Sequence, residues 1–295
     1  MSGWDAGDVP DQRGRTVVVT GANGGLGLEV TRVLAGAGAT VVMACRDVAK
    51  ARSVASGIDG RTVVRALDLS DLSSVRSFAG GLGPVDVLVN NAGVLAVPWG
   101  VTADGFERHI GVNHLGPFLL TGLLINRVRD RVVTVTSGLH VLGRIDDDLQ
   151  WQRRRYRRWS AYAQSKLANL LFAYELQRRL VAAGRRTMSV AAHPGVAATE
   201  GQRRDTSLSG RILAGGPAQS PRMGALPILY AATVADVPGG GCVGPDGLFG
   251  RTGHPTVVRT SRRSRSPVAA ARLWSRSEEL VGARYDIVPL TAAPA

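Results

Sequence analysis

The chain has 295 residues, of which 44% are hydrophobic, and a mean hydropathy of +0.04, so it can bury a sizeable core, as a single large α/β domain or two small ones. It has no apolar run near the ~18 residues of a membrane-spanning helix, no secretory signal and only two cysteines, and we therefore expect a cytoplasmic protein with no membrane partner. The formal net charge is +13, with arginine clusters at 153–158 and 259–265, but no nucleic-acid motif accompanies them, so we expect no specific nucleic-acid partner.

The first predicted element is a buried parallel strand at Arg15–Thr20, an apolar and β-branched run. A glycine-rich loop, Gly21–Gly27, and a helical pattern over residues 28–37 follow it. In this context Gly21 permits a tight turn, Gly25 lets the backbone approach a pyrophosphate, and the last glycine allows helix and sheet to pack closely. Because the helix N-terminus offers free N–H groups to phosphates, the segment predicts a dinucleotide site.

The second predicted strand, Thr40–Ala44, leads to Cys45, Arg46 and Asp47. At this place, roughly 20 residues past the glycines, an acidic residue binds the ribose 2′-hydroxyl of NAD or an arginine binds the 2′-phosphate of NADP. Both residue types are present, but Arg46 comes first out of the strand, so we favour NADP(H) over NAD(H). Asp47 then suits the N-cap of the following helix.

Polar residues end the next two predicted strands. The strand at 62–67 leads into Asp68-Leu69 and a helix over residues 71–80. The strand at 85–89 leads into Asn90–Gly93. Asn and Gly at a strand end suit a turn that faces a ligand at the carboxyl edge of a sheet, although a plain turn is the alternative for each taken singly.

The middle of the chain predicts one long or two short helices within 105–126, with Asn113 buried among apolar neighbours. A fifth strand at 131–136 brings Ser137 to the same sheet edge. The polar, arginine-rich stretch 139–159 shows no periodicity and is interpreted as a surface loop flanking a pocket.

An amphipathic helix is predicted from Ser160 onward, with Ser160 as its N-cap. Tyr162 and Lys166 lie four residues apart and so share one helix face. A nearby ammonium favours the phenolate, and we expect it to lower the pKa of Tyr162 toward the working range of a general acid/base. Apart from Lys50, Lys166 is the only lysine in a chain that otherwise uses arginine, which supports a specific role for it.

A sixth strand at 188–192 leads into His193-Pro194-Gly195, and the unpatterned stretch 196–220 is a candidate substrate lid. The five histidines show no metal-ligand spacing, so we expect no metal site. The remaining expected elements are a helix at 223–233, a short strand at 242–249, an exposed connector at 259–267, and a closing helix at 268–281 ended by Gly282.

The alternation of strands and helices predicts an α/β fold with a single doubly wound parallel sheet and helices on both faces. We place it in one domain over residues 15–282, with an N-terminal tail at 1–14 and a C-terminal tail at 283–295. This arrangement puts all the polar strand ends on one edge.

Taken together, these motifs resemble the short-chain dehydrogenase/reductase family, a Rossmann fold, over about residues 15–250. The stretches 44–46, 111–116 and 164–172 look more narrowly like its retinol-dehydrogenase-like and protochlorophyllide-reductase-like branch, although Pro117 departs from the histidine usual there. The matching motifs are Thr20–Gly27, Asp68-Leu69, Asn90–Gly93, Asn113, Ser137, Tyr162-x-x-x-Lys166 and Pro194-Gly195.

The resemblance implies roles for individual residues. Tyr162 would be the general acid/base, Ser137 would hydrogen-bond the reacting oxygen, Lys166 would hold the nicotinamide ribose, and Asn113 would anchor a water that relays protons. It also implies a homodimer or homotetramer. The residues that would bind the cofactor are Gly21, Asn23, Gly25, Leu26, Gly27, Arg46, Asp68, Leu69, Asn90, Asn91, Ala92, Gly93, Tyr162, Lys166, Pro194, Val196 and Thr199.

The sequence thus predicts an oxidoreductase that moves hydride between NADP(H) and the carbonyl or alcohol group of a small, fairly apolar substrate. The alternative is a regulator that senses NADP(H) without catalysis, which the basic surface suggests. A sensor has no need for Ser137, Tyr162 and Lys166 together, so the enzyme is preferred.

Overall fold

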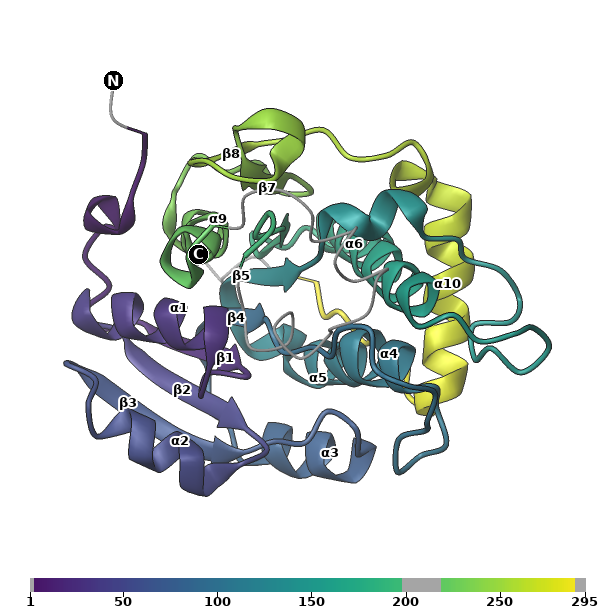
Figure 1. Ribbon diagram of the computed structural model, residues 1–295. Coiled ribbons are helices and arrows are strands. Elements are labelled where there is room, and N and C mark those ends of the chain that lie inside the picture. The colour runs from purple at the N-terminus through teal and green to yellow at the C-terminus, as the bar shows by residue number, and fades with distance from the viewer. Residues whose placement is uncertain (1–2, 198–218, 290–295) are drawn as a thin grey trace.

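A single eight-stranded sheet, in the order β3-β2-β1-β4-β5-β6-β7-β8, forms the centre of the molecule (Figure 1). The computed structural model describes residues 3–197 and 219–289. All strand pairs are parallel except β7 with β8. The strands are β1 (Thr16–Thr20), β2 (Thr40–Cys45), β3 (Arg61–Ala66), β4 (Val85–Asn90), β5 (Val128–Val135), β6 (Met188–Ala192), β7 (Cys242–Pro245) and β8 (Pro255–Val257).

Helices cover both faces of this sheet, which confirms the doubly wound α/β fold. One apolar core joins the sheet to α1 (Gly25–Gly36), α2 (Val48–Ala55) and α9 (Pro221–Thr233). The core on the other face joins it to α3 (Leu72–Gly80), α5 (Gly116–Leu124) and α6 (Arg158–Ala182). None of the described helices is both long and apolar enough to cross a bilayer.

The strand order reverses between β1 and β4, which pair directly through Val18 and Leu88. Connections from β1 run outward to β2 and β3, whereas those from β4 run the other way to β5 and β6. The loops that follow β1 and β4 therefore diverge at the carboxyl edge and leave a crevice there. Fully buried valines at 17–19 fit a strand covered on both faces.

Several predicted boundaries are confirmed. The Asp47 side chain accepts the N–H of Lys50 and caps α2. Asp71 does the same for α3, accepting from Ser73 and Ser74. At the end of the chain, α10 (Pro267–Val281) stops at Gly282, whose φ of 59° is readily adopted by glycine.

Other boundaries were predicted wrongly. The helix α6 begins at Arg158 with Arg157 as N-cap, so Ser160 lies inside its first turn and does not cap it. The strand expected at 242–249 ends at Pro245. The antiparallel strand β8 that follows it was not predicted, because so short a strand is specified mainly by the β7 residues that it pairs with.

The helical region before β5 is interrupted. It consists of α4 (Arg108–Ile110), a π-helical turn at Gly111–Leu115, and then α5. Asn113 lies within the π-helical turn and is buried, as expected. Short 3-10 turns occupy Ala6–Asp8, Ile125–Arg127, Gly138–Leu142, Leu248–Gly250 and Arg263–Arg265.

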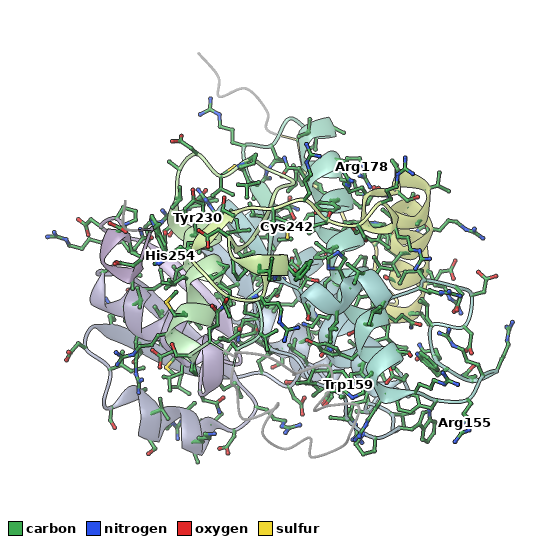
Figure 2. All side chains as sticks on the ribbon, turned by 45° about the horizontal axis from the view of Figure 1, so that its top comes forward. Arg155, Trp159, Arg178, Tyr230, Cys242 and His254 are labelled. Carbon is green, nitrogen blue, oxygen red and sulfur yellow. The ribbon has the colours of Figure 1, made fainter. Side chains whose placement is uncertain are left out.

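Both ends of the described chain pack on the domain. The Trp4 ring meets Tyr230 of α9 edge-on at 5.2 Å, and the Trp4 carbonyl lies 3.0 Å from Nδ1 of His254. In Figure 2, Tyr230 and His254 lie close together on the left of the molecule. At the other end, the Tyr285 hydroxyl donates to the Phe118 carbonyl at 2.6 Å.

The last helix, α10, lies along α6 on the side away from the sheet (Figure 1). Its Trp274 ring stacks on Phe172 of α6 at 5.8 Å and meets Phe118 of α5 edge-on at 5.1 Å. His114 joins this aromatic cluster, and its Nε2 lies 2.9 Å from the Ser277 hydroxyl of α10. Thus α10 holds the outer faces of α5 and α6 together.

We expect mild acid to destabilise the fold through His114. Burial lowers the pKa of this imidazole to about 3, from 6.5, so the unfolded chain binds a proton first as the pH falls below 6.5. The free energy of unfolding should therefore drop by about 1.5 kcal/mol between pH 6.5 and about 5 on account of His114 alone. Urea denaturation of the wild type and of His114→Gln across this pH range measures the effect. If the free energy of unfolding changed equally with pH in both proteins, the prediction would be contradicted.

Candidate active site

The crevice at the carboxyl ends of β1 and β4 holds a cavity of about 550 Å³. Its walls come from the glycine-rich loop, the end of β2, the end of β3 and the turn after β4. They include Gly21, Asn23, Gly25, Leu26, Gly27, Arg46, Asp68, Leu69, Asn91, Ala92 and Gly93. Eleven of the residues predicted to bind a cofactor therefore meet in one cavity.

The glycine-rich loop admits only very small residues at two places. Gly21 has a φ of 67°, in the left-handed region. A Cβ placed on Gly27 would lie 2.3 Å from the Gly21 carbonyl oxygen, so any side chain there would collide with the backbone. The helix α1 starts from Gly24 without a side-chain cap, which leaves its first N–H groups for an anion beside the cavity.

Two basic residues, Arg46 and Lys50, line the cavity beyond β2. Lys50 was not predicted as a site residue. Its amine lies 3.8 Å from the position that a Cβ on Gly24 would take, so it reaches the glycine-rich loop. The signal for it was present in the composition, since this chain has only two lysines and both line the crevice.

The turn after β4 is held by Thr20 at the end of β1. The Thr20 hydroxyl accepts the N–H groups of Asn91 and Ala92 at 3.0 and 2.9 Å. The Asn91 amide donates to the Thr20 carbonyl at 2.8 Å. Asn90 differs from the prediction, because its side chain turns into the core and donates to the Thr121 hydroxyl at 2.9 Å.

A second cavity, of about 520 Å³, continues from the first and shares Leu26, Asn91, Gly93 and Val94 with it. One wall is the loop 94–98. The opposite walls are formed by Val135, Thr136, Arg158, Tyr162, Lys166 and Pro194. The two cavities together provide space for an extended cofactor and for a second small molecule beside one end of it.

Tyr162 and Lys166 line this second cavity, and Ser137 comes directly after Thr136 of its wall. Ser137 follows β5. Its hydroxyl accepts the Leu139 N–H at 3.3 Å and lies close enough to Tyr162 to lower the pKa of the phenol. The Lys166 amine donates to the Val135 carbonyl at 3.2 Å and lies 5.7 Å from the centre of the Tyr162 ring. The predicted one-face arrangement of Tyr162 and Lys166 is thus present, one turn apart on α6.

The predicted direction of the Tyr162 pKa is wrong. Burial raises the pKa of Tyr162 to about 12, and the hydrogen bond with Ser137 only partly opposes this. Burial also lowers the pKa of Lys166 to about 8. The sequence shows the charge next to the phenol, but it does not show how far packing desolvates each group, and in this structure the loss of solvation dominates.

Asn113 connects the wall of the second cavity to α6. Its side chain accepts the Val94 N–H at 2.7 Å and donates to the Val94 carbonyl at 3.0 Å. It also donates to the Ser165 hydroxyl at 2.9 Å, and Ser165 in turn donates to the Tyr162 carbonyl. A π-helical turn often marks a functional site, and here it carries the residue that joins the cavity wall to α6.

Some predictions are not met or not covered. Val196 lies outside both cavities, and its N–H donates to the Arg251 carbonyl at 2.8 Å. Thr199 and most of the stretch 196–220 lie outside the described residues. Leu149 and Trp151 are buried, so the stretch 139–159 is not simply a surface loop. Within residues 3–197 and 219–289, no group of His, Cys, Asp and Glu side chains could hold a metal.

Comparison with known proteins gives consistent matches. The model of a family described as short chain dehydrogenase matches residues 15–207. Human retinol dehydrogenase 12 is 43% identical, over 92% of this chain and 88% of its own. The crystal structure of an uncharacterized protein from Mycobacterium paratuberculosis is 50% identical, with a TM-score of 0.87 over 97% of this chain and all of its own. A 3-ketoacyl-(acyl-carrier-protein) reductase from Brucella melitensis, solved with NADH, is 26% identical, with a TM-score of 0.62 over 78% of this chain and 96% of its own.

Proposed function

The chain belongs to the short-chain dehydrogenase family, and from this premise we propose that Ser137, Tyr162 and Lys166 carry its reaction. It is an oxidoreductase that acts on alcohol and carbonyl groups with a nicotinamide cofactor. The assignment rests on Tyr162 and Lys166, which line a cavity that continues from the glycine-rich loop, with Ser137 beside Tyr162.

Tyr162 is the proton donor in this proposal. When bound, the nicotinamide supplies or accepts the hydride. A pKa near 12 keeps the phenol protonated at neutral pH, which is the form that can protonate a carbonyl oxygen during reduction. Ser137 donates a second hydrogen bond to the same oxygen, and Lys166 faces the ribose. Alcohol oxidation needs the phenolate, so its rate should rise with pH.

Arg46 and Lys50 make NADP(H) the proposed cofactor. Both line the first cavity at the end of β2. Asp47, the acidic neighbour that would suit NAD, instead uses its carboxylate to cap α2. A pair of cations beside the ribose favours a 2′-phosphate, which adds nearly two negative charges at that position.

The substrate is a small molecule, and we propose that it is fairly apolar. The wall of the second cavity at 94–98 is built from Val94, Leu95, Ala96, Val97 and Pro98. Retinol, which names one of the relatives above, is of this kind. We further propose that residues 15–282 form the working domain and that it assembles as a homodimer or homotetramer.

A panel of aldehydes, ketones and alcohols tests the function. We expect NADPH oxidation, followed by its absorbance, with apolar aldehydes or ketones. Small polar carbonyls such as pyruvate should react at least about tenfold more slowly, because they leave the apolar wall at 94–98 uncovered. Absence of turnover with every carbonyl and every alcohol would refute the proposal.

A further inference from the structure

A buried acid–base cluster lies directly behind the wall of the second cavity and is not used in the chemistry above. It consists of Glu107, His109 and Tyr156. Glu107 and His109 are 1% and 0% exposed. The Glu107 carboxylate accepts the N–H groups of His109 and Ile110 at 3.0 and 2.9 Å, and it lies 2.9 Å from Nδ1 of His109 and 3.0 Å from the Tyr156 hydroxyl.

Burial disfavours the charged form of Glu107, but these hydrogen bonds and the nearby His109 outweigh it, so the pKa of Glu107 is lowered and the carboxylate is ionised. The environment of His109 fixes its tautomer. Its Nε2 accepts the Val97 N–H at 3.2 Å. The ring proton therefore lies on Nδ1, facing Glu107.

The cluster acts on one residue of the cavity wall. Besides the Val97 N–H held by His109, the Tyr156 hydroxyl lies 3.2 Å from the Val97 carbonyl and shares its one proton between that carbonyl and Glu107. Both backbone polar groups of Val97 are thus bound by the cluster. The preceding residue, Ala96, has a φ of 45°, a left-handed conformation that costs about 1 kcal/mol or more for a non-glycine residue. Bonds at Val97 offset this cost and keep the loop in place.

The same cluster touches the proposed proton donor. The His109 ring meets the Tyr162 ring edge-on at 6.1 Å, with an angle of 68° between the planes. Trp159 makes a second edge contact with Tyr162, at 6.2 Å. Figure 2 shows Trp159 at the start of α6, whereas Arg155, in the loop before it, extends from the edge of the molecule. One imidazole therefore contacts both the cavity wall and the phenol.

The segment that carries Tyr156 is itself fastened to α6. Gln164 donates to the Leu149 carbonyl at 2.9 Å and accepts from the Arg154 guanidinium at 2.5 Å. Arg154 also lies over the Trp151 ring, 3.7 Å from its centre, and Trp151 meets Tyr156 edge-on. Tyr156 thus has a fixed base from which to hold Val97.

We propose that Glu107, His109 and Tyr156 are positioning residues that set the distance between the substrate wall at Val97 and the hydroxyl of Tyr162. An ionised carboxylate in the core is costly, and apolar residues could fill this space at lower cost. The cluster instead directs one hydrogen-bond acceptor and one donor at the backbone of a single wall residue, Val97. This proposal rests on the proposed function, because it assumes that Tyr162 acts on a substrate held against that wall.

The test is Tyr156→Phe, which removes one hydroxyl and keeps the ring. With NADPH and the best carbonyl of the panel, we expect KM to rise by about fivefold, the value of one hydrogen bond. We expect kcat to fall by about tenfold, because small shifts of a reacting pair are costly. The Kd of NADPH should stay unchanged, since none of the three residues lines the first cavity.

Tyr174→Phe is the matched control. Tyr174 is another half-buried tyrosine, on α6, and its hydroxyl lies 2.9 Å from that of Thr260, away from both cavities. Its loss should lower the unfolding temperature about as much as Tyr156→Phe and leave kcat and KM as in the wild type. If Tyr156→Phe behaved like this control in kinetics, the positioning role would be refuted.

A second variant, His109→Phe, keeps an aromatic ring beside Tyr162 but removes the acceptor of the Val97 N–H. Because both changes act through Val97, the double variant should be little less active than the less active of the two single variants. Full additivity of the two losses would also overturn the proposal. A wild-type protein without turnover would instead refute the proposed function, and this proposal with it. Turnover with unaltered kinetics in both single variants would refute this proposal alone.

Discussion

Replacing Tyr162 with Phe should lower kcat for carbonyl reduction by about a thousandfold, the contribution of a positioned general acid. The change removes only the hydroxyl that donates the proton. The remaining ring keeps its edge contacts with His109 and Trp159, so the cavity should hold its shape. Initial rates of NADPH oxidation with the best carbonyl substrate measure the loss.

The fold and the first cavity serve as internal controls for this variant. Most of the residues predicted to bind the cofactor line the cavity of the glycine-rich loop, which Tyr162 does not, so the Kd of NADPH, followed by fluorescence, should change by less than about fivefold, the value of one hydrogen bond. The unfolding temperature should change little, because Tyr162 is only partly buried and the change removes a single hydroxyl at the cavity surface. A variant that kept more than about a tenth of wild-type kcat would show that another group moves the proton.

The second large effect concerns the choice of cofactor. We expect Arg46→Asp to lower the ratio of kcat/KM with NADPH to that with NADH by about a hundredfold, because it replaces a charge-assisted bond to the 2′-phosphate by repulsion. The same carboxylate would accept the ribose 2′-hydroxyl of NADH. Steady-state kinetics with each cofactor at a saturating carbonyl concentration give the ratio.

Arg52→Asp is the control for this change of charge. Arg52 lies near the end of α2, is exposed, and is not among the residues that line the cavity. It makes the same alteration of net charge, so any shift of the ratio that it shares reflects long-range attraction alone. Equal ratios for Arg46→Asp and Arg52→Asp would contradict the assignment of Arg46.

Patterns repeated along the chain allowed the fold to be predicted. A run such as Thr16–Thr20, followed by a glycine-rich loop and a helical pattern, predicts a buried parallel strand. The same alternation of strand and helix recurs through β6. Elements specified by distant partners were missed. The short strand β8 depends on β7, and the π-helical turn coincides with Asn113, whose side chain bonds to Val94 and Ser165.

The candidate site could be predicted where a side chain follows a strand or shares a helix face. Tyr162 and Lys166 come from one helix, and the glycine-rich loop comes from one turn. Lys50 was missed because it lies a helical turn beyond the expected position of the cofactor-selecting residue. The direction of the Tyr162 pKa was missed because burial follows from the packing of several segments and not from the spacing of two residues.

The helix α10 has a practical consequence for how much of the chain the reaction requires. The family match ends at residue 207, yet Trp274 and Ser277 come from beyond it and seal the helices that carry Asn113 and Tyr162. A protein shortened to the matched stretch would expose the aromatic side chains that α10 covers to water and would be prone to aggregation. The last helix is therefore an integral part of the catalytic scaffold, although it contributes no atom to either cavity.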